Sequence, residues 1–239
     1  MNTPSPAQAR KRSFDLLKPR AVTLLTLGVL LLCAVSHGTL DRSLALLLDR
    51  TIDTPAENFW NDITKIGNAV PYLTACLLLY IAGRLGLVLT APEAIARRYY
   101  AASRIGLLGL VSYAVSGALV HAIKYSLGRM RPTLLFKDGL YGFSPFHGGW
   151  ATSSFPSGHT QSIFVIATLL ALLFPRMKWL FFSIAFSVGL SRLMVQAHYL
   201  SDVLFGAYIA VMSVLLVREY LFPDVKAVNQ SSATLENST

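Results

Sequence analysis

The chain has 239 residues, of which 54% are apolar and only 14% are charged, and its mean hydropathy is +0.52. These values exclude an ordinary soluble domain and predict an all-α, polytopic membrane bundle with room for about six transmembrane helices of roughly 20 residues each. The formal net charge of +9 could suggest nucleic acid. The basic residues, however, lie beside apolar segments, which indicates membrane orientation and an anionic substrate.

The N-terminal part is polar and mostly basic, so we expect residues 1–20 to stay in the cytoplasm. The first span should then cover about residues 21–35. A cleavable signal peptide is the alternative, because this apolar run is short and Ala34-Val35-Ser36 resembles a cleavage site.

Residues 37–67 are polar enough to form an external connection. Four leucines and four charged residues occupy opposite sides at helical spacing, which predicts a helix on the membrane surface. A lid over the site and simple packing against the bundle are the alternatives, and packing is the interpretation that we favour. The leucines are Leu40, Leu44, Leu47 and Leu48, and the charged residues are Asp41, Arg42, Asp49 and Arg50.

Five more apolar runs predict the remaining spans, at about residues 69–89, 105–123, 162–174, 179–190 and 203–217. The membrane domain should therefore cover residues 21–220, and the polar tail at 221–239 has a composition typical of disorder. Basic residues place the connections near 97–104 and 176–178 in the cytoplasm, so that the third and fifth spans run outward. The third span also spaces small residues for close helix packing, at Gly106, Gly109, Ser112, Ser116 and Gly117.

Three polar motifs lie at the edges of these runs, all on the predicted outer side. They are Lys124-x6-Arg131-Pro132, then Pro156-Ser157-Gly158-His159, then Ser191-Arg192-x5-His198-x3-Asp202. The second motif suits an anion, because its proline and glycine let the backbone turn and its N–H groups lie at the positive end of the helix that follows. Together the motifs predict a basic pocket that contains histidine.

In this order and with these spacings, the motifs resemble the three-part signature of the type-2 phosphatidic acid phosphatase superfamily. The resemblance covers Lys124 to Asp202, and the surrounding apolar runs are similar to the six-helix layout of the family's membrane branch. It implies that His198 attacks phosphorus to form a phosphohistidine, while His159 protonates the leaving group and later activates water. It also implies that no metal or other cofactor is required. The vanadium haloperoxidases share the motifs, but they are soluble, and the hydropathy of this chain disfavours them.

The residue chemistry agrees with that resemblance. His198 and Asp202 are four residues apart, which on a helix places them on one face, so that the carboxylate can orient the imidazole. Phosphoryl transfer spreads negative charge over oxygens, and fixed cations and N–H donors stabilise it. The expected phosphate-binding residues are Lys124, Arg131, Ser157, Gly158 and Arg192.

Two sets of polar residues stay open at this point. His37, His121 and His147 are interpreted as interfacial residues at helix ends. Arg129 lies inside the first motif but not at a signature position, so either a phosphate contact or a head-group contact is open to it.

The sequence therefore predicts an integral membrane lipid phosphatase that hydrolyses a phosphate monoester or diphosphate at the outer leaflet. A bacterial inner membrane is expected, with the site facing the periplasm. Its expected partners are a phosphorylated lipid and membrane lipids, with no nucleic acid, and the oligomeric state stays open. The substrates of the family that the motifs resemble include phosphatidic acid, phosphatidylglycerol phosphate, polyprenyl diphosphates and the phosphorylated glucosamine lipid of outer membranes, and the motifs do not choose among them. The alternative class is a membrane protein that binds phosphate without cleaving it.

Overall fold

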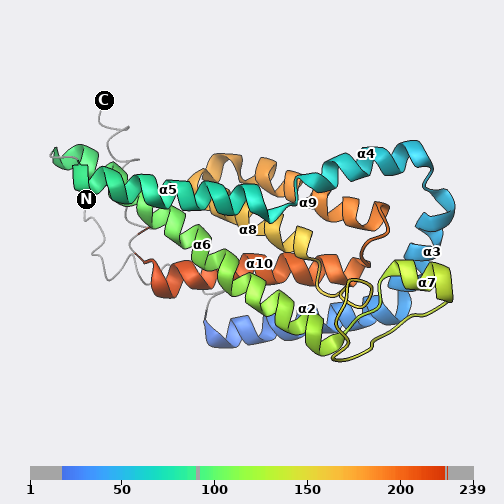
Figure 1. The fold of residues 1–239 in the computed structure, drawn as a ribbon. Helices are drawn as coiled ribbons and strands as arrows, with labels where there is room; N and C mark the ends of the chain where they lie inside the picture. The colour runs from blue at the N-terminus through green and yellow to red at the C-terminus, as the bar shows by residue number, and fades with distance from the viewer. Residues whose placement is uncertain (1–17, 90–91, 224, 226–239) are drawn as a thin grey trace.

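The computed structural model describes residues 18–89, 92–223 and 225. The part of the chain so described is all-α, and its long helices lie side by side in one elongated bundle (Figure 1). The predicted fold class is confirmed. The helices are α2 (Pro19–Thr39), α3 (Asp41–Thr51), α4 (Thr54–Lys65), α5 (Ala69–Leu89), α6 (Glu93–Leu127), α7 (Pro132–Asp138), α8 (Gly158–Leu173), α9 (Lys178–Met194) and α10 (Leu200–Leu221).

Within the described residues, five helical stretches are long and apolar enough to cross a membrane: Pro19–Thr39, Thr54–Leu89, Glu93–Leu127, Pro175–Met194 and Leu200–Leu221. The remaining helix is α8, the fourth predicted span, which has 16 residues and so a length of about 24 Å. It is short for a hydrocarbon core of about 30 Å. The predicted count of about six spans is confirmed.

The connections divide between the two ends of the bundle. The end of α5, the start of α6 and the end of α10 lie at one end, while α3, α4 and α7 lie at the other (Figure 1). The loops that carry the three motifs lie with α3, α4 and α7. The long helices therefore deliver all three motifs to a single end of the molecule.

Helix α8 packs against α6, α9 and α10 at the centre of the bundle. Val165 of α8 and Ala210 and Val214 of α10 are fully buried in the same core cluster. By contrast, leucines of α2 such as Leu24 and Leu31 are exposed, as expected for side chains that face lipid.

Small residues let α5 and α6 approach closely. A Cβ atom at Gly106 would lie 2.6 Å from the carbonyl oxygen of Cys76, and one at Gly109 would lie 2.5 Å from its sulfur. The predicted packing role of these glycines is confirmed. Gly117 differs, because a Cβ atom there would meet nothing within 4 Å.

Several predicted boundaries shift. The first span extends to Pro19–Thr39, and α9 continues through Arg192 to Met194. The loop after the third span contains the short helix α7. At the C-terminal end α10 runs to Leu221, and Phe222 and Val225 are buried against the core. Residues 224 and 226–239 of the predicted tail lie outside the described residues, as does the predicted cytoplasmic segment up to residue 17.

The predicted external connection forms two helices, α3 and α4. The prediction of its polar face was wrong at one position. Asp41, expected on the polar face, is only 1% exposed, whereas Leu40 and Leu47 are 53% and 56% exposed. Ala45 of α3 packs instead against Leu135 and Tyr199. Asp41 can be buried because it is bonded to a buried arginine, which is described below.

Candidate active site

The first motif crosses a sharp change of direction after α6. Gly128 adopts a left-handed conformation with φ +59°, and a Cβ atom there would lie 1.7 Å from the carbonyl oxygen of Ser144. Only glycine fits this position, so α6 stops there and the chain runs on to Pro132 at the start of α7. Lys124 thus lies in the last turn of α6, and its Nζ donates to the carbonyl oxygen of Ser153.

Arg131 is bonded to three backbone carbonyls. It donates from Nε to Trp150 at 2.8 Å, from Nη1 to Ala197 at 3.0 Å and from Nη2 to Ser153 at 3.3 Å. Its guanidinium also stacks 4.4 Å from the ring centre of Trp150. These contacts join the first motif to the loop before the second motif and to the residue before His198.

The second motif caps α8 and is fixed to α10. The Ser157 side chain accepts from the N–H of Thr160, and its own N–H donates to the carbonyl oxygen of Asp202 at 3.0 Å. Gly206 permits this contact, because a Cβ atom there would lie 2.6 Å from the Ser157 carbonyl oxygen. Since the cap uses Thr160, the N–H groups of Gly158 and His159 are the ones at the helix start that a ligand can reach.

His159 lies on the first turn of α8 beside the turn between α4 and α5. A Cβ atom at Gly67 would lie 3.0 Å from the Cβ atom of His159 and 3.1 Å from its ring. The positive charges of Arg192, Arg131 and Lys124 all act on this imidazole. The structure therefore brings the three predicted cations and His159 into one electrostatic neighbourhood.

Arg192 lies in the last turn of α9, and its carbonyl oxygen accepts from the N–H groups of Ala197 and His198. Its Nη1 donates to the hydroxyl of Thr64 on α4. Its buried Nε has no hydrogen-bond partner within the described part of the chain. Helix α4 thus helps to position Arg192, one of the predicted phosphate-binding residues.

His198 and Asp202 meet, although not in the way that the sequence suggested. The expectation was that both lie on one helical face, but α10 begins only at Leu200, so His198 precedes the helix. The Asp202 side chain folds back onto the helix start, where Oδ2 accepts from the N–H of Tyr199 at 2.9 Å and lies 3.4 Å from His198 Nδ1. A capping turn therefore replaces the helical face.

Burial sets the protonation state of His198. Its side chain is 3% exposed, and burial lowers the pKa of His198 to about 3, although Asp202 acts in the opposite direction. The imidazole is therefore uncharged at neutral pH. With Nδ1 beside a carboxylate, its other nitrogen has the free lone pair that a nucleophile needs.

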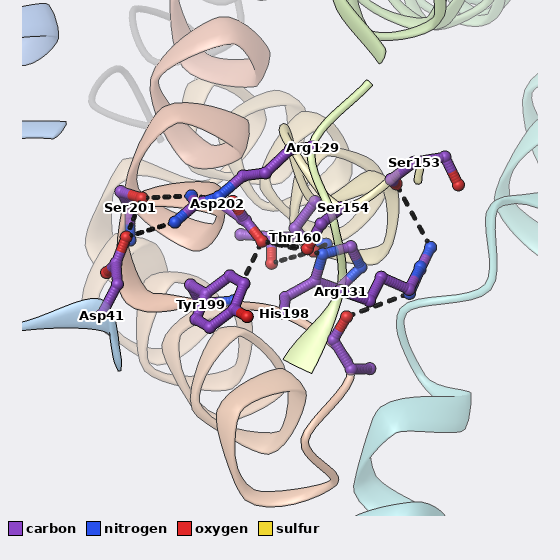
Figure 2. A network of polar contacts seen from close by, with 12 residues as sticks. Asp41, Arg129, Arg131, Ser153, Ser154, Thr160, His198, Tyr199, Ser201 and Asp202 are labelled. Atoms are coloured by element: carbon purple, nitrogen blue, oxygen red, sulfur yellow. Dashed lines mark hydrogen bonds and ion pairs between the residues drawn. The ribbon is translucent and has the colours of Figure 1, made fainter. Parts of the chain in front are cut away.

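Sequence reasoning missed the partners of Arg129. Its guanidinium is buried and forms ion pairs with Asp202 and with Asp41 of α3, at 2.7 Å in the latter case (Figure 2). His37, which the sequence placed among the interfacial histidines, is also bonded here: its Nδ1 lies 3.1 Å from Arg129 Nη2 and 2.9 Å from the hydroxyl of Tyr141. The only signal in the sequence was a second arginine inside the first motif.

A cavity of about 350 Å³ opens beside the basic residues. Lys124 and Arg131 line it, as do His121 and His147, the other two histidines that were interpreted as interfacial. Its size lies in the range of small-ligand pockets. The other lining residues are Tyr125, Gly148, Gly149 and Ser153.

Metal-type clusters are not found among the described residues: no group of three His, Cys, Asp or Glu side chains is arranged to hold an ion. Asp202, the acid nearest to the motifs, already bonds Arg129, Ser154 and Tyr199. The donor set at this site consists of cations and N–H groups, which suits an anionic ligand.

The family model of the PAP2 superfamily matches residues 106–225, about half of the chain, and this range contains all three motifs. The chain belongs to the PAP2 superfamily. It is an integral membrane lipid phosphatase that acts on phosphate esters of lipids, as the motifs predicted.

Two curated relatives share a name. The lipid A 1-phosphatase of Rhizobium johnstonii is 32% identical over 166 residues, which cover 68% of this chain and 68% of the relative. The lipid A 1-phosphatase of Rhizobium etli is 34% identical over 144 residues, covering 60% of this chain and 62% of the relative.

Two crystal structures share the fold. Aquifex aeolicus LpxE gives a TM-score of 0.56 at 21% identity and covers 76% of this chain and 96% of its own. The first transmembrane PAP2 type phosphatidylglycerolphosphate phosphatase from Bacillus subtilis gives 0.58 at 22% identity, with 83% and 94% covered. The fold shared with these two structures therefore covers helices outside the motif region as well as the motifs.

Proposed function

We propose that this protein removes the 1-phosphate of a lipid A-type glycolipid at the outer leaflet of a bacterial inner membrane. The observation that carries the proposal is the pairing of an uncharged, carboxylate-oriented His198 with two cations, Lys124 and Arg131, that line the cavity. Arg131 also donates to the carbonyl oxygen of Ala197, the residue before His198. Such a pairing supplies a nucleophile and the positive charge that a transferring phosphoryl group needs. A protein that only binds phosphate would need no oriented nucleophile.

The reaction follows from these positions. The free ring nitrogen of His198 forms a bond to phosphorus as the bond from phosphorus to the lipid oxygen breaks. The negative charge of the bound phosphate group favours the protonated form of His159, and that proton passes to the lipid oxygen. Water, deprotonated by His159, then attacks the phosphohistidine, which releases phosphate and restores His198. The N–H groups of Gly158 and His159 and the side chains of Lys124, Arg131 and Arg192 hold the non-bridging oxygens, while Ser157 fixes the turn that aims them.

The substrate class rests on two supports. The chain is 32% and 34% identical to two lipid A 1-phosphatases, and a cavity of about 350 Å³ next to Lys124 and Arg131 leaves room for a head group larger than a bare phosphate. Tyr125, His121 and His147 give that cavity groups that can bond to sugar hydroxyls.

A panel of lipid phosphates tests this function. Purified protein in detergent would be given lipid A 1-phosphate, phosphatidic acid, phosphatidylglycerol phosphate and a polyprenyl diphosphate side by side, with and without EDTA. We expect the fastest phosphate release from lipid A and no loss on chelation, because no metal enters the proposed reaction. Faster release from another lipid would replace the substrate, and a loss restored by magnesium or zinc would replace the mechanism.

The orientation in the membrane is part of the proposal. Basic residues at 97–98 and 176–178 favour the cytoplasm, which leaves α7 and the motifs facing the periplasm. Lys137 of α7 and Lys178 of α9 are exposed, so Lys137→Cys and Lys178→Cys can each be placed in a background lacking Cys33 and Cys76. An impermeant thiol reagent added to intact cells should label only the first. Labelling of the second alone would reverse the orientation.

A further inference from the structure

Asp202 belongs to a cluster of three buried charges, in which Asp41 lies on the side of Asp202 away from Arg131 (Figure 2). Arg129 is its centre: Nη2 donates to Asp41 Oδ2 at 2.7 Å and Nη1 donates to Asp202 Oδ1. The side chains of Arg129, Asp41 and Asp202 are 1%, 0% and 0% exposed. Charges buried this deeply are costly unless they are paired, so the three depend on one another.

Further hydrogen bonds fix both carboxylates. Asp41 Oδ1 accepts from the hydroxyl of Ser36 at 2.8 Å and from the N–H of Ser201 at 3.1 Å. Asp202 Oδ2 accepts from Ser154 and lies 3.4 Å from His198 Nδ1. The cluster therefore ties the corner between α2 and α3 to the carboxylate that faces His198.

The cluster also carries a net charge. Two carboxylates and one guanidinium leave one negative charge uncompensated next to an imidazole that burial keeps neutral. When His198 bonds to phosphorus and keeps its proton on Nδ1, the ring becomes positive. A fixed negative charge beside it stabilises that form over the free imidazole.

We propose that Arg129 and Asp41 are positioning residues for the nucleophile, which hold Asp202 against His198 and supply the excess negative charge that stabilises its positive ring. Neither residue touches the substrate cavity. The inference rests on the proposed function for the identity of the nucleophile. It adds a role for the external connection, since Asp41 is the first residue of α3.

Orthovanadate tests the inference without relying on lipid turnover, because it takes the five-coordinate geometry of the transition state and would bond to the same ring nitrogen. Its affinity for the full-length protein in detergent would be measured by calorimetry. Asp41→Asn removes the excess charge with little change of shape and should weaken binding about tenfold or more. Arg129→Lys keeps the charge and should retain more affinity than Arg129→Met. Equal affinity for Asp41→Asn and the parent would overturn the inference, as would a parent that binds no vanadate.

A matched control separates positioning from simple stabilisation. Tyr113→Phe removes a buried hydrogen bond of 2.9 Å to Ser162, between α6 and α8, and should lower the melting temperature while vanadate affinity stays unchanged. If Asp41→Asn behaves in the same way, the cluster is structural only and the proposal is wrong.

Lipid turnover gives the second readout and distinguishes the two proposals. With the fastest substrate of the panel, Asp41→Asn should lower kcat and leave KM nearly unchanged, because the cluster acts on the ring rather than on bound lipid. A parent that binds vanadate but turns over no lipid would end the proposed function and leave this inference standing. A normal kcat for Asp41→Asn in an active parent would end this inference alone.

Discussion

The two sides of His198 are built differently, although both are rich in charge (Figure 2). On the closed side, Arg129 is 1% exposed and pairs with two carboxylates. On the open side, Arg131 donates to three uncharged backbone carbonyls and lines a cavity of about 350 Å³. Lys124 is held in the same way by the carbonyl oxygen of Ser153.

This difference explains how one motif can serve two purposes. A carbonyl partner orients a cation without neutralising it, so the charges of Lys124 and Arg131 remain available to phosphate. The charge of Arg129 is instead neutralised inside the protein. Two arginines separated by a single residue therefore differ in their partners: Arg129 pairs with Asp202, and Arg131 keeps a charge that the proposed phosphate site can use.

The largest expected effect is at the boundary between the two sides. His198→Ala removes the nucleophile and should lower kcat by roughly 10⁴-fold or more. Asp202→Asn should keep a slow residual rate: its amide N–H would face His198 Nδ1 and favour the tautomer whose outer nitrogen carries the proton. Mass spectrometry of protein quenched in alkali during turnover should find phosphate on His198. Phosphate on His159 or Ser157 would overturn the assignment.

A conservative change on the open side should have the next largest effect. Arg131→Lys keeps the charge but loses the planar guanidinium, which in the parent protein donates to three backbone carbonyls. We therefore expect kcat/KM to fall about 100-fold. The loss should be mainly in KM for a lipid phosphate, in contrast to the kcat effect expected behind Asp202. Steady-state kinetics of the two variants side by side check this. If Arg131→Lys lowers kcat and leaves KM unchanged, the two sides of His198 do not differ in their effects on KM and kcat as proposed.

Much of the open side could be predicted from the sequence. Its residues stand in short motifs at fixed spacing, and hydrophobic periodicity placed those motifs at helix ends. Where the prediction failed, local geometry decided: His198 and Asp202 meet through a capping turn, because α10 begins at Leu200. A spacing of four residues permits both arrangements.

The closed side could not be predicted for a different reason. Asp41 lies 88 residues before its partner Arg129, in a segment where charged and apolar residues alternate with helical period. Such a pattern predicts that Asp41 faces solvent, since a charge is rarely buried without a partner. The partner becomes visible only when the start of α3 is placed beside the segment between α6 and α7 that contains Arg129. Tertiary pairing overrode the local pattern here.

The protonation state of His198 predicts a pH effect on stability. Its folded pKa of about 3 lies below the ordinary value near 6.5, so below about pH 6.5 the unfolded chain binds a proton that the folded chain does not. This contribution is fully present above pH 6.5 and is lost as the pH falls from there toward 3. Between pH 7 and pH 5 the free energy of unfolding should drop by about 2 kcal/mol from this group. Melting of parent and His198→Gln in detergent isolates it, because the variant should lack that part of the slope. Parallel curves would mean that His198 is not buried in its neutral form.

The smallest effect is expected at the helix start on the open side. A Cβ atom at Gly158 meets nothing within 4 Å, and Cβ atoms of a helix tilt toward its N-terminus. Gly158→Ala should therefore leave the melting temperature unchanged while its methyl group occupies the space proposed for phosphate, which should raise KM about tenfold. Gly206→Ala is the matched opposite, because its Cβ atom would lie 2.6 Å from the Ser157 carbonyl oxygen. That variant should lose stability as the second motif is pushed away from α10. If Gly158→Ala binds lipid phosphate as well as the parent does, the phosphate does not lie over the start of α8, and the N–H groups of Gly158 and His159 have another role.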